Sequence, residues 1–69
     1  MFEILIVTCL ASHPLICSRL EVPAYYRTKD ACYDDLPNVL NMTVDVLYSQ
    51  KLNETIYIDK WNCREVRND

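Results

Sequence analysis

The clearest hydrophobic pattern of the chain is an alternation of apolar and mostly polar residues over NMTVDVLY, residues 41–48. A period of two predicts a half-buried β-strand. A second β-rich run, TIYIDKWNC, occupies residues 55–63, and the stretch between the two runs suits a hairpin loop. We therefore predict an antiparallel hairpin formed by residues 41–48 and 55–63.

The segment before this hairpin, VPAYYRTKDACYDDLP, is less regular. Pro23 and Pro37 bound it, and its apolar positions fit an amphipathic helix only loosely. Both a short helix and an irregular segment held by Cys32 remain open. The predicted fold class is a small α+β or mainly β domain, stabilised by a disulfide, with the hairpin following this segment.

The N-terminus carries an apolar run from Ile4 to Ala11, and Pro14 follows it closely. The run has the length of a signal-peptide h-region, and Ile16 and Ser18 can serve as the −3 and −1 residues of a cleavage site. This predicts a signal peptide at residues 1–18 and one small secreted or luminal domain at residues 19–69. Two features argue against it: Glu3 stands where a basic residue is usual, and the isoleucine at −3 is large. The alternatives are a buried N-terminal strand of a cytosolic domain and an uncleaved anchor.

The four cysteines bear on the same choice. Removal of a signal peptide would take Cys9 and Cys17 with it, and Cys32 and Cys63 would form one disulfide. Closing that loop of about 30 residues would stabilise the fold by roughly 3–4 kcal/mol in the chain-entropy account. In the cytosolic alternative all four thiols would be reduced.

Two Asn-X-Thr triplets, Asn41-Met42-Thr43 and Asn53-Glu54-Thr55, are acceptor sequences for N-glycosylation. They agree with the signal-like start and the two remaining cysteines in favouring the secretory pathway. We therefore predict N-glycosylation at Asn41 and Asn53, and a secreted or endoplasmic-reticulum-luminal protein, with a cytoplasmic location as the alternative.

Composition argues against catalysis and against nucleic acid. The 69 residues carry a net charge of −3 with no run of Lys or Arg that could follow a phosphate backbone. The single histidine, His13, would leave with the signal peptide, and no C-x₂-C pair suggests a zinc site. Asp34 and Asp35 are neighbours and so do not face one another, and a chain without glycine has no usual phosphate loop. We expect no enzyme activity, no catalytic residue, no cofactor, no metal and no stable membrane span.

Protein binding remains as the function to expect. Tyr25 and Tyr26 are the candidate partner contacts, since two consecutive residues of a strand cannot both point inward. A very short secreted glycoprotein with one disulfide is similar in size and cellular location to accessory and immune-modulating products of large viruses and to small secreted effectors. The alternatives are a cytosolic structural or interaction subunit with an N-terminal core strand, or a truncated piece of a longer ectodomain.

Overall fold

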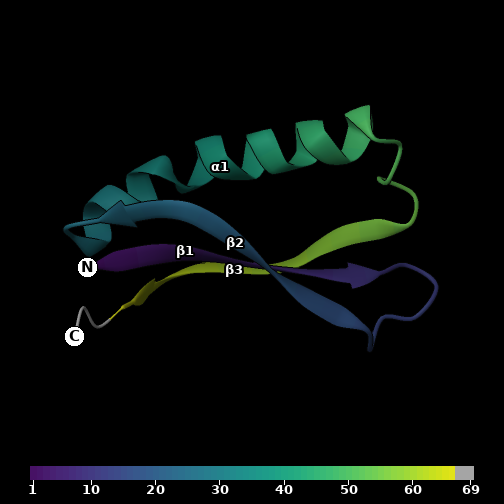
Figure 1. Ribbon diagram of the computed structural model, residues 1–69, viewed down its shortest axis with the longest axis horizontal. Coiled ribbons are helices and arrows are strands. Elements are labelled where there is room, and N and C mark those ends of the chain that lie inside the picture. Colours follow the sequence, from purple (N-terminus) through teal and green to yellow (C-terminus); the bar gives the residue numbers. More distant parts are fainter. Residues whose placement is uncertain (67–69) are drawn as a thin grey trace.

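A computed structural model describes residues 1–66 of the chain as a three-stranded sheet with one long helix. The elements are β1 (Phe2–Leu10), β2 (Cys17–Tyr26), α1 (Lys29–Ser49) and β3 (Ile56–Glu65). The sheet order is β2-β1-β3, and both pairings are antiparallel. Helix α1 lies across one face of the sheet and leaves the other face uncovered (Figure 1). The expectation of a small, disulfide-stabilised α+β domain is confirmed.

The predicted strand over residues 41–48 is wrong, because these residues lie in the C-terminal half of α1. The helix begins at the N-cap Thr28, whose side chain accepts a hydrogen bond from the backbone N–H of Ala31 at 3.1 Å. Its buried residues Cys32, Leu36 and Val39 follow a helical spacing.

Once the helix is nucleated upstream, the alternating apolar residues cannot share one face, since residues two positions apart lie on opposite sides of a helix. They are exposed or nearly so, from 37% for Val44 to 63% for Tyr48. Pro37, expected to end the helix, lies inside it with an exposed ring. A proline inside a helix costs about 3 kcal/mol, because it removes one backbone hydrogen bond and its ring crowds the preceding turn.

The second predicted strand is confirmed, but its neighbour is different. Residues 55–63 correspond to β3, which pairs with β1 rather than with residues 41–48. The pairing runs from Leu10 opposite Ile56 to Phe2 opposite Glu65, with a bulge at Asp59.

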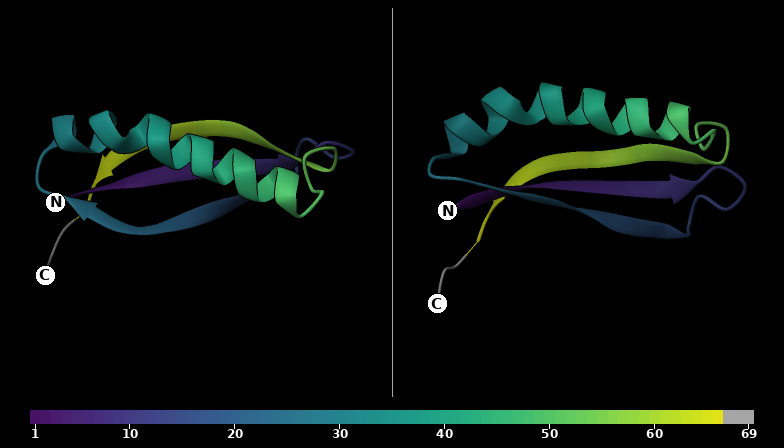
Figure 2. Two further views of the ribbon diagram at one scale, coloured as in Figure 1. Left: turned by 90° about the horizontal axis from the view of Figure 1, so that it is seen from above. Right: turned by 45° about the horizontal axis from the view of Figure 1, so that its top comes forward.

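Strand β1 is the central strand of the sheet (Figure 2). It also supplies part of the core. Its Ile4 and Ile6 are 2% and 0% exposed and pack with residues of α1 and with Cys63 of β3. This matches the alternative interpretation of the N-terminal run as a buried strand. A chain that began at Arg19 would lack the strand that joins β2 to β3, so the predicted signal peptide and this fold cannot both describe one mature chain. The cleavage itself stays a prediction.

Both pairs of cysteines are bonded. The predicted Cys32–Cys63 disulfide is present and ties the first turns of α1 to the end of β3. A second disulfide, Cys9–Cys17, joins directly opposite residues of β1 and β2 and closes the loop between them. The sequence argument missed it because it assigned both cysteines to the signal peptide.

Candidate protein-binding face

The open face of the sheet carries an apolar centre with polar surroundings. Because side chains alternate along a strand, Ile4 and Ile6 point toward α1 while Leu5 and Val7 point away from it. Leu5 and Val7 remain half-buried, although no element of residues 1–66 covers them. Their cross-strand neighbours are polar: Glu21 and Arg19 on β2, and Asn62 and Lys60 on β3.

Trp61 stands beside this centre. Together with five other residues it lines a shallow groove of about 390 Å³; the lining residues are Leu5, Val7, Asp59, Lys60, Trp61 and Asn62. The indole is 51% exposed. Asp59 is the extra residue of the bulge, because Val7 pairs with Lys60 and Thr8 with Ile58. Bulges re-aim the side chains that follow them.

The bulge shifts Trp61 and Cys63 by one position, so that they come opposite Ile6 and Ile4 of β1 and share the face of the sheet on which α1 lies. Alternation along β3 predicts that Trp61 and Cys63 share a face and a degree of burial. The structure buries Cys63 to 7% exposure and leaves Trp61 half in solvent. Sequence analysis did not single out Leu5, Val7 or Trp61 as a surface, since it assigned the first two to a signal peptide. The signal that could have found them is the strand-like run at the N-terminus, which was weighed as the alternative.

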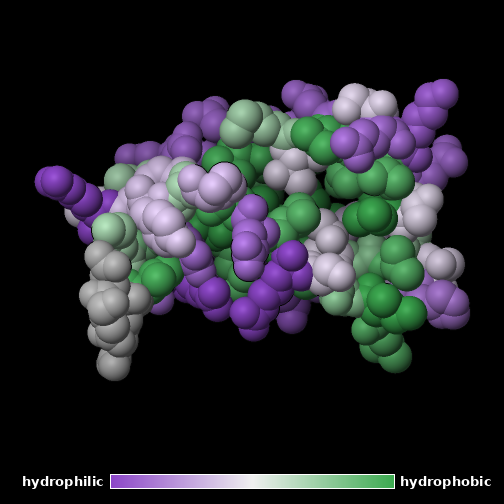
Figure 3. Space-filling model, in the orientation of Figure 1, coloured by the Kyte–Doolittle hydropathy of each residue, from purple (hydrophilic) through white to green (hydrophobic). Residues whose placement is uncertain are grey.

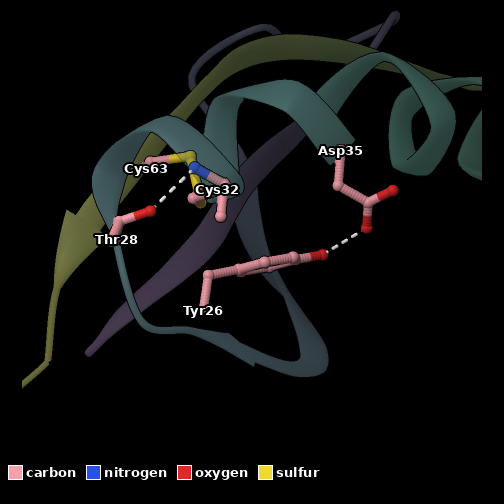
Figure 4. The surroundings of a disulfide bond; sticks show 6 residues. Tyr26, Thr28, Cys32, Asp35 and Cys63 are labelled. Atoms are coloured by element: carbon pink, nitrogen blue, oxygen red, sulfur yellow. Dashed lines mark hydrogen bonds between the residues drawn. A yellow bond between two sulfur atoms is a disulfide. The ribbon is translucent and has the colours of Figure 1, made fainter.

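The two candidate tyrosines lie on different faces of β2, as the alternation rule requires. Tyr25 is 62% exposed on the open face, where it pairs with Glu3. Tyr26 packs against the core, and its hydroxyl donates a hydrogen bond to the carboxylate of Asp35 on α1 (Figure 4). Tyr25 therefore remains a contact candidate, whereas Tyr26 holds β2 to the helix.

This hydrogen bond shifts the acidity of both groups. It holds the pKa of Asp35 below its ordinary value, with a smaller contribution from a second hydrogen bond donated by Asn38. The same bond raises the pKa of Tyr26, assisted by partial burial and by the neighbouring negative charge. Asp35 is thus occupied by a structural contact and does not pair with Asp34.

One ion pair lies at the edge of the open face. The guanidinium Nε of Arg64 is 2.5 Å from Oε1 of Glu3, so the pair links β3 to the central strand. The Arg64 side chain is 46% exposed, which makes the pair a weak contributor to stability. It places charge of both signs beside the apolar centre.

Both glycosylation triplets lie at the surface. Asn41 is exposed on α1, and Asn53 is exposed in the turn between α1 and β3. The hydroxyl of Thr43 donates a hydrogen bond to the backbone oxygen of Val39 at 2.9 Å, whereas Thr55 is exposed. Neither asparagine lies on the open face, so glycans at both would leave that face free.

A second apolar region lies where α1 meets β2. Leu20 and Val22 of β2 face Val39, Met42 and Val46 of the helix across an open groove. Met42 and Val46 are 60% and 50% exposed. Apolar surface shows between the helix and the sheet and at one end of the molecule (Figure 3).

Groups that could support chemistry are dispersed. In residues 1–66, no cluster of three or more His, Cys, Asp or Glu side chains could hold a metal ion. His13 lies in the exposed loop between β1 and β2. No helix in the described part of the chain is long and apolar enough to cross a bilayer.

Comparison with family models, with curated proteins and with solved structures finds no match to this chain. The functional argument therefore depends on its own residues.

Proposed function

We propose that this chain is a small secreted or endoplasmic-reticulum-luminal glycoprotein, of an accessory or effector kind, that binds a partner protein without catalysis. The observation that supports binding is the apolar groove on the β3 side of the sheet, which the half-exposed Trp61 lines together with Leu5 and Val7 of the open face. Tryptophan and tyrosine dominate binding energy at protein interfaces, where they sit in desolvated centres surrounded by polar rims. Here Arg19, Glu21 and Lys60 would form such a rim.

The compartment is supported by the cysteines. Two disulfides in a chain of 69 residues are typical of an oxidising, extracellular or luminal setting. The cytosolic alternative shares the buried N-terminal strand with this fold but predicts four reduced thiols. A piece of a longer ectodomain would keep both the strand and the disulfides.

The binding surface is tested by Trp61→Ala at the groove, with Tyr25→Ala as a second change on the open face. Each removes an exposed aromatic ring without opening a buried core, so folding should be retained. We expect Trp61→Ala to weaken binding about 30-fold, the loss of a hot-spot residue of roughly 2 kcal/mol. The readout is the dissociation constant for an extracellular partner identified with the unaltered protein.

Tyr48→Ala is the matched control, since Tyr48 is 63% exposed on the helix, away from the open face. Equal affinity of the Trp61 variant and the unaltered protein, or an equal loss in the Tyr48 variant, would refute this groove as the binding surface.

The compartment is tested by intact mass after expression in secretory-competent cells, with and without glycosidase and reductant. A secreted chain that loses mass on deglycosylation supports the proposal if reduction adds about four protons to a chain that begins at Met1, or about two to a chain that begins near Arg19. An unglycosylated cytosolic chain with free thiols contradicts it. The same spectrum shows whether the mature chain begins at Met1 or near Arg19, and so decides the predicted cleavage.

A further inference from the structure

The free edge of β2 is self-complementary, and we propose that it pairs with the same edge of a second copy of this chain. The pairing is antiparallel and centred on Leu20, so that the two sheets join into one six-stranded sheet. The order would be β3-β1-β2 followed by β2-β1-β3 of the second copy. The two copies are related by a two-fold axis that is perpendicular to the sheet and passes between the two Leu20 residues. This axis keeps both helices on the same side of the joined sheet.

The phase of the β1–β2 ladder shows which backbone groups are free. Cys9 and Cys17 are directly opposite, with Cα atoms 4.0 Å apart, the short spacing of a non-hydrogen-bonded pair. Hydrogen-bonded and non-hydrogen-bonded pairs alternate from there, and the register runs without a shift to Glu21. Arg19 and Glu21 therefore occupy non-hydrogen-bonded positions, with their N–H and C=O groups directed to the open edge.

Centring the pairing on Leu20 uses these groups. Arg19 comes opposite Glu21 of the second copy, Glu21 comes opposite its Arg19, and each is a hydrogen-bonded pair. The two side chains also carry opposite charges on the same face, the favourable arrangement for cross-strand neighbours. By symmetry the contact occurs twice, because each β2 strand carries both the positive and the negative residue.

The same arrangement also covers apolar side chains on the face of β2 that faces α1. Leu20 is 38% exposed and would lie opposite Leu20 of the second copy in a close, non-hydrogen-bonded pair. Val46 of α1 lines the groove beside Leu20, so the axis would bring this part of both helices together. The exposed Met42 and Val46 would then border a trough shared by the two copies.

The other edge of the sheet is less suited to pairing. Strand β3 carries the bulge at Asp59, and bulges and charged residues at an edge prevent its extension. On β2 the ladder between copies is confined to Ser18–Val22, because Pro23, which would come opposite Cys17, has no N–H to donate. The pairing therefore stops at two chains and does not propagate into a fibre, since the β2 edge is used once per chain.

The test is a charge exchange read out by sedimentation of the full disulfide-bonded chain over a range of concentrations. Arg19→Glu places like charges opposite Glu21, and Glu21→Arg places like charges opposite Arg19. We expect each variant alone to dimerise at least about tenfold more weakly than the unaltered chain, because like charges directly opposite are destabilising. An equimolar mixture of the two variants restores opposite charges in both pairs and should dimerise as a heterodimer.

Lys60→Glu on the β3 edge is the matched control and should leave the dimer unchanged. Far-ultraviolet dichroism and the absence of free thiols show that each variant is folded. A chain that stays monomeric at every concentration overturns the proposal. So do a mixture that behaves like its separate components and a dimer that is lost on changing Lys60. The unaltered dimer, its loss in both variants and its return in the mixture establish it.

Discussion

At the scale of single residues, the hydrogen bond from Tyr26 to Asp35 makes stability depend on pH. The folded-state pKa of Asp35 is lowered, so its contribution is present above the ordinary carboxyl value of about 4 and is lost as pH falls through the lowered value. The pKa of Tyr26 is raised, so its contribution is present below about 10 and is lost as pH rises through the raised value.

Tyr26→Phe should therefore lower the urea midpoint at pH 7 and leave a smaller difference from the unaltered chain at both extremes. The measurement is the urea midpoint at about pH 2.5, 7 and 11. Tyr33→Phe is the control, since Tyr33 is a half-exposed tyrosine of α1 and should leave the midpoint unchanged at every pH. A constant deficit of the Tyr26 variant across this range would show that the lost hydroxyl acts through packing alone.

At the scale of elements, the two disulfides differ in exposure and in the loops they close. Cys17 is exposed, whereas Cys32 and Cys63 are 0% and 7% exposed. A thiolate reductant can therefore reach the Cys9–Cys17 bond first. With limited reductant, we expect alkylation at Cys9 and Cys17 before any at Cys32 or Cys63, mapped by mass spectrometry of the digested chain.

The lengths of the two disulfide-closed loops also predict which bond stabilises the fold more. The bonds span 8 and 31 residues. In the chain-entropy account, their replacement by serine pairs costs about 2.5 kcal/mol for Cys9–Cys17 and about 3.7 kcal/mol for Cys32–Cys63. The free energies of unfolding of the two double-serine variants check this, and an inverted order would show that native contacts outweigh loop closure.

The elements also show where sequence reasoning succeeds. The strand at β3, the Cys32–Cys63 bond and the opposite orientations of Tyr25 and Tyr26 follow from local alternation and from cysteine number. The prediction of a strand over residues 41–48 failed because eight residues show only their own hydrophobic period. They do not show that a helix begins at Thr28 and continues through them. The helical spacing of Leu36, Val39 and Thr43 was the competing signal.

The N-terminal run was interpreted as a signal peptide for a different reason. A central strand buried on one face and partly covered on the other is nearly continuous in hydrophobicity, as is a signal-peptide h-region. Local sequence cannot distinguish them, because the difference lies in whether two other strands pair with the run. The candidate binding face could not be predicted either, since Leu5 and Val7 form part of a sheet surface only when β1 lies between β2 and β3.

At the scale of the whole molecule, the fold depends on its first strand. Residues 19–69 retain one disulfide and the helix, but they lose Ile4, Ile6 and every pairing partner of β2 and β3. We expect this shortened chain to unfold without a cooperative transition, whereas the full chain unfolds with one, as monitored by near-ultraviolet dichroism of Trp61 and the tyrosines. The full chain made and oxidised in parallel is the control.

The result also separates the two interpretations of the N-terminus. A cooperative transition in residues 19–69, with the Cys32–Cys63 bond formed, would mean that β2 and β3 can pair without β1. The mature domain could then follow cleavage after Ser18 with a rearranged sheet. Loss of the transition means that any functional form of this fold keeps residues 1–18, because an edge strand cannot replace the central one through which the whole sheet is paired.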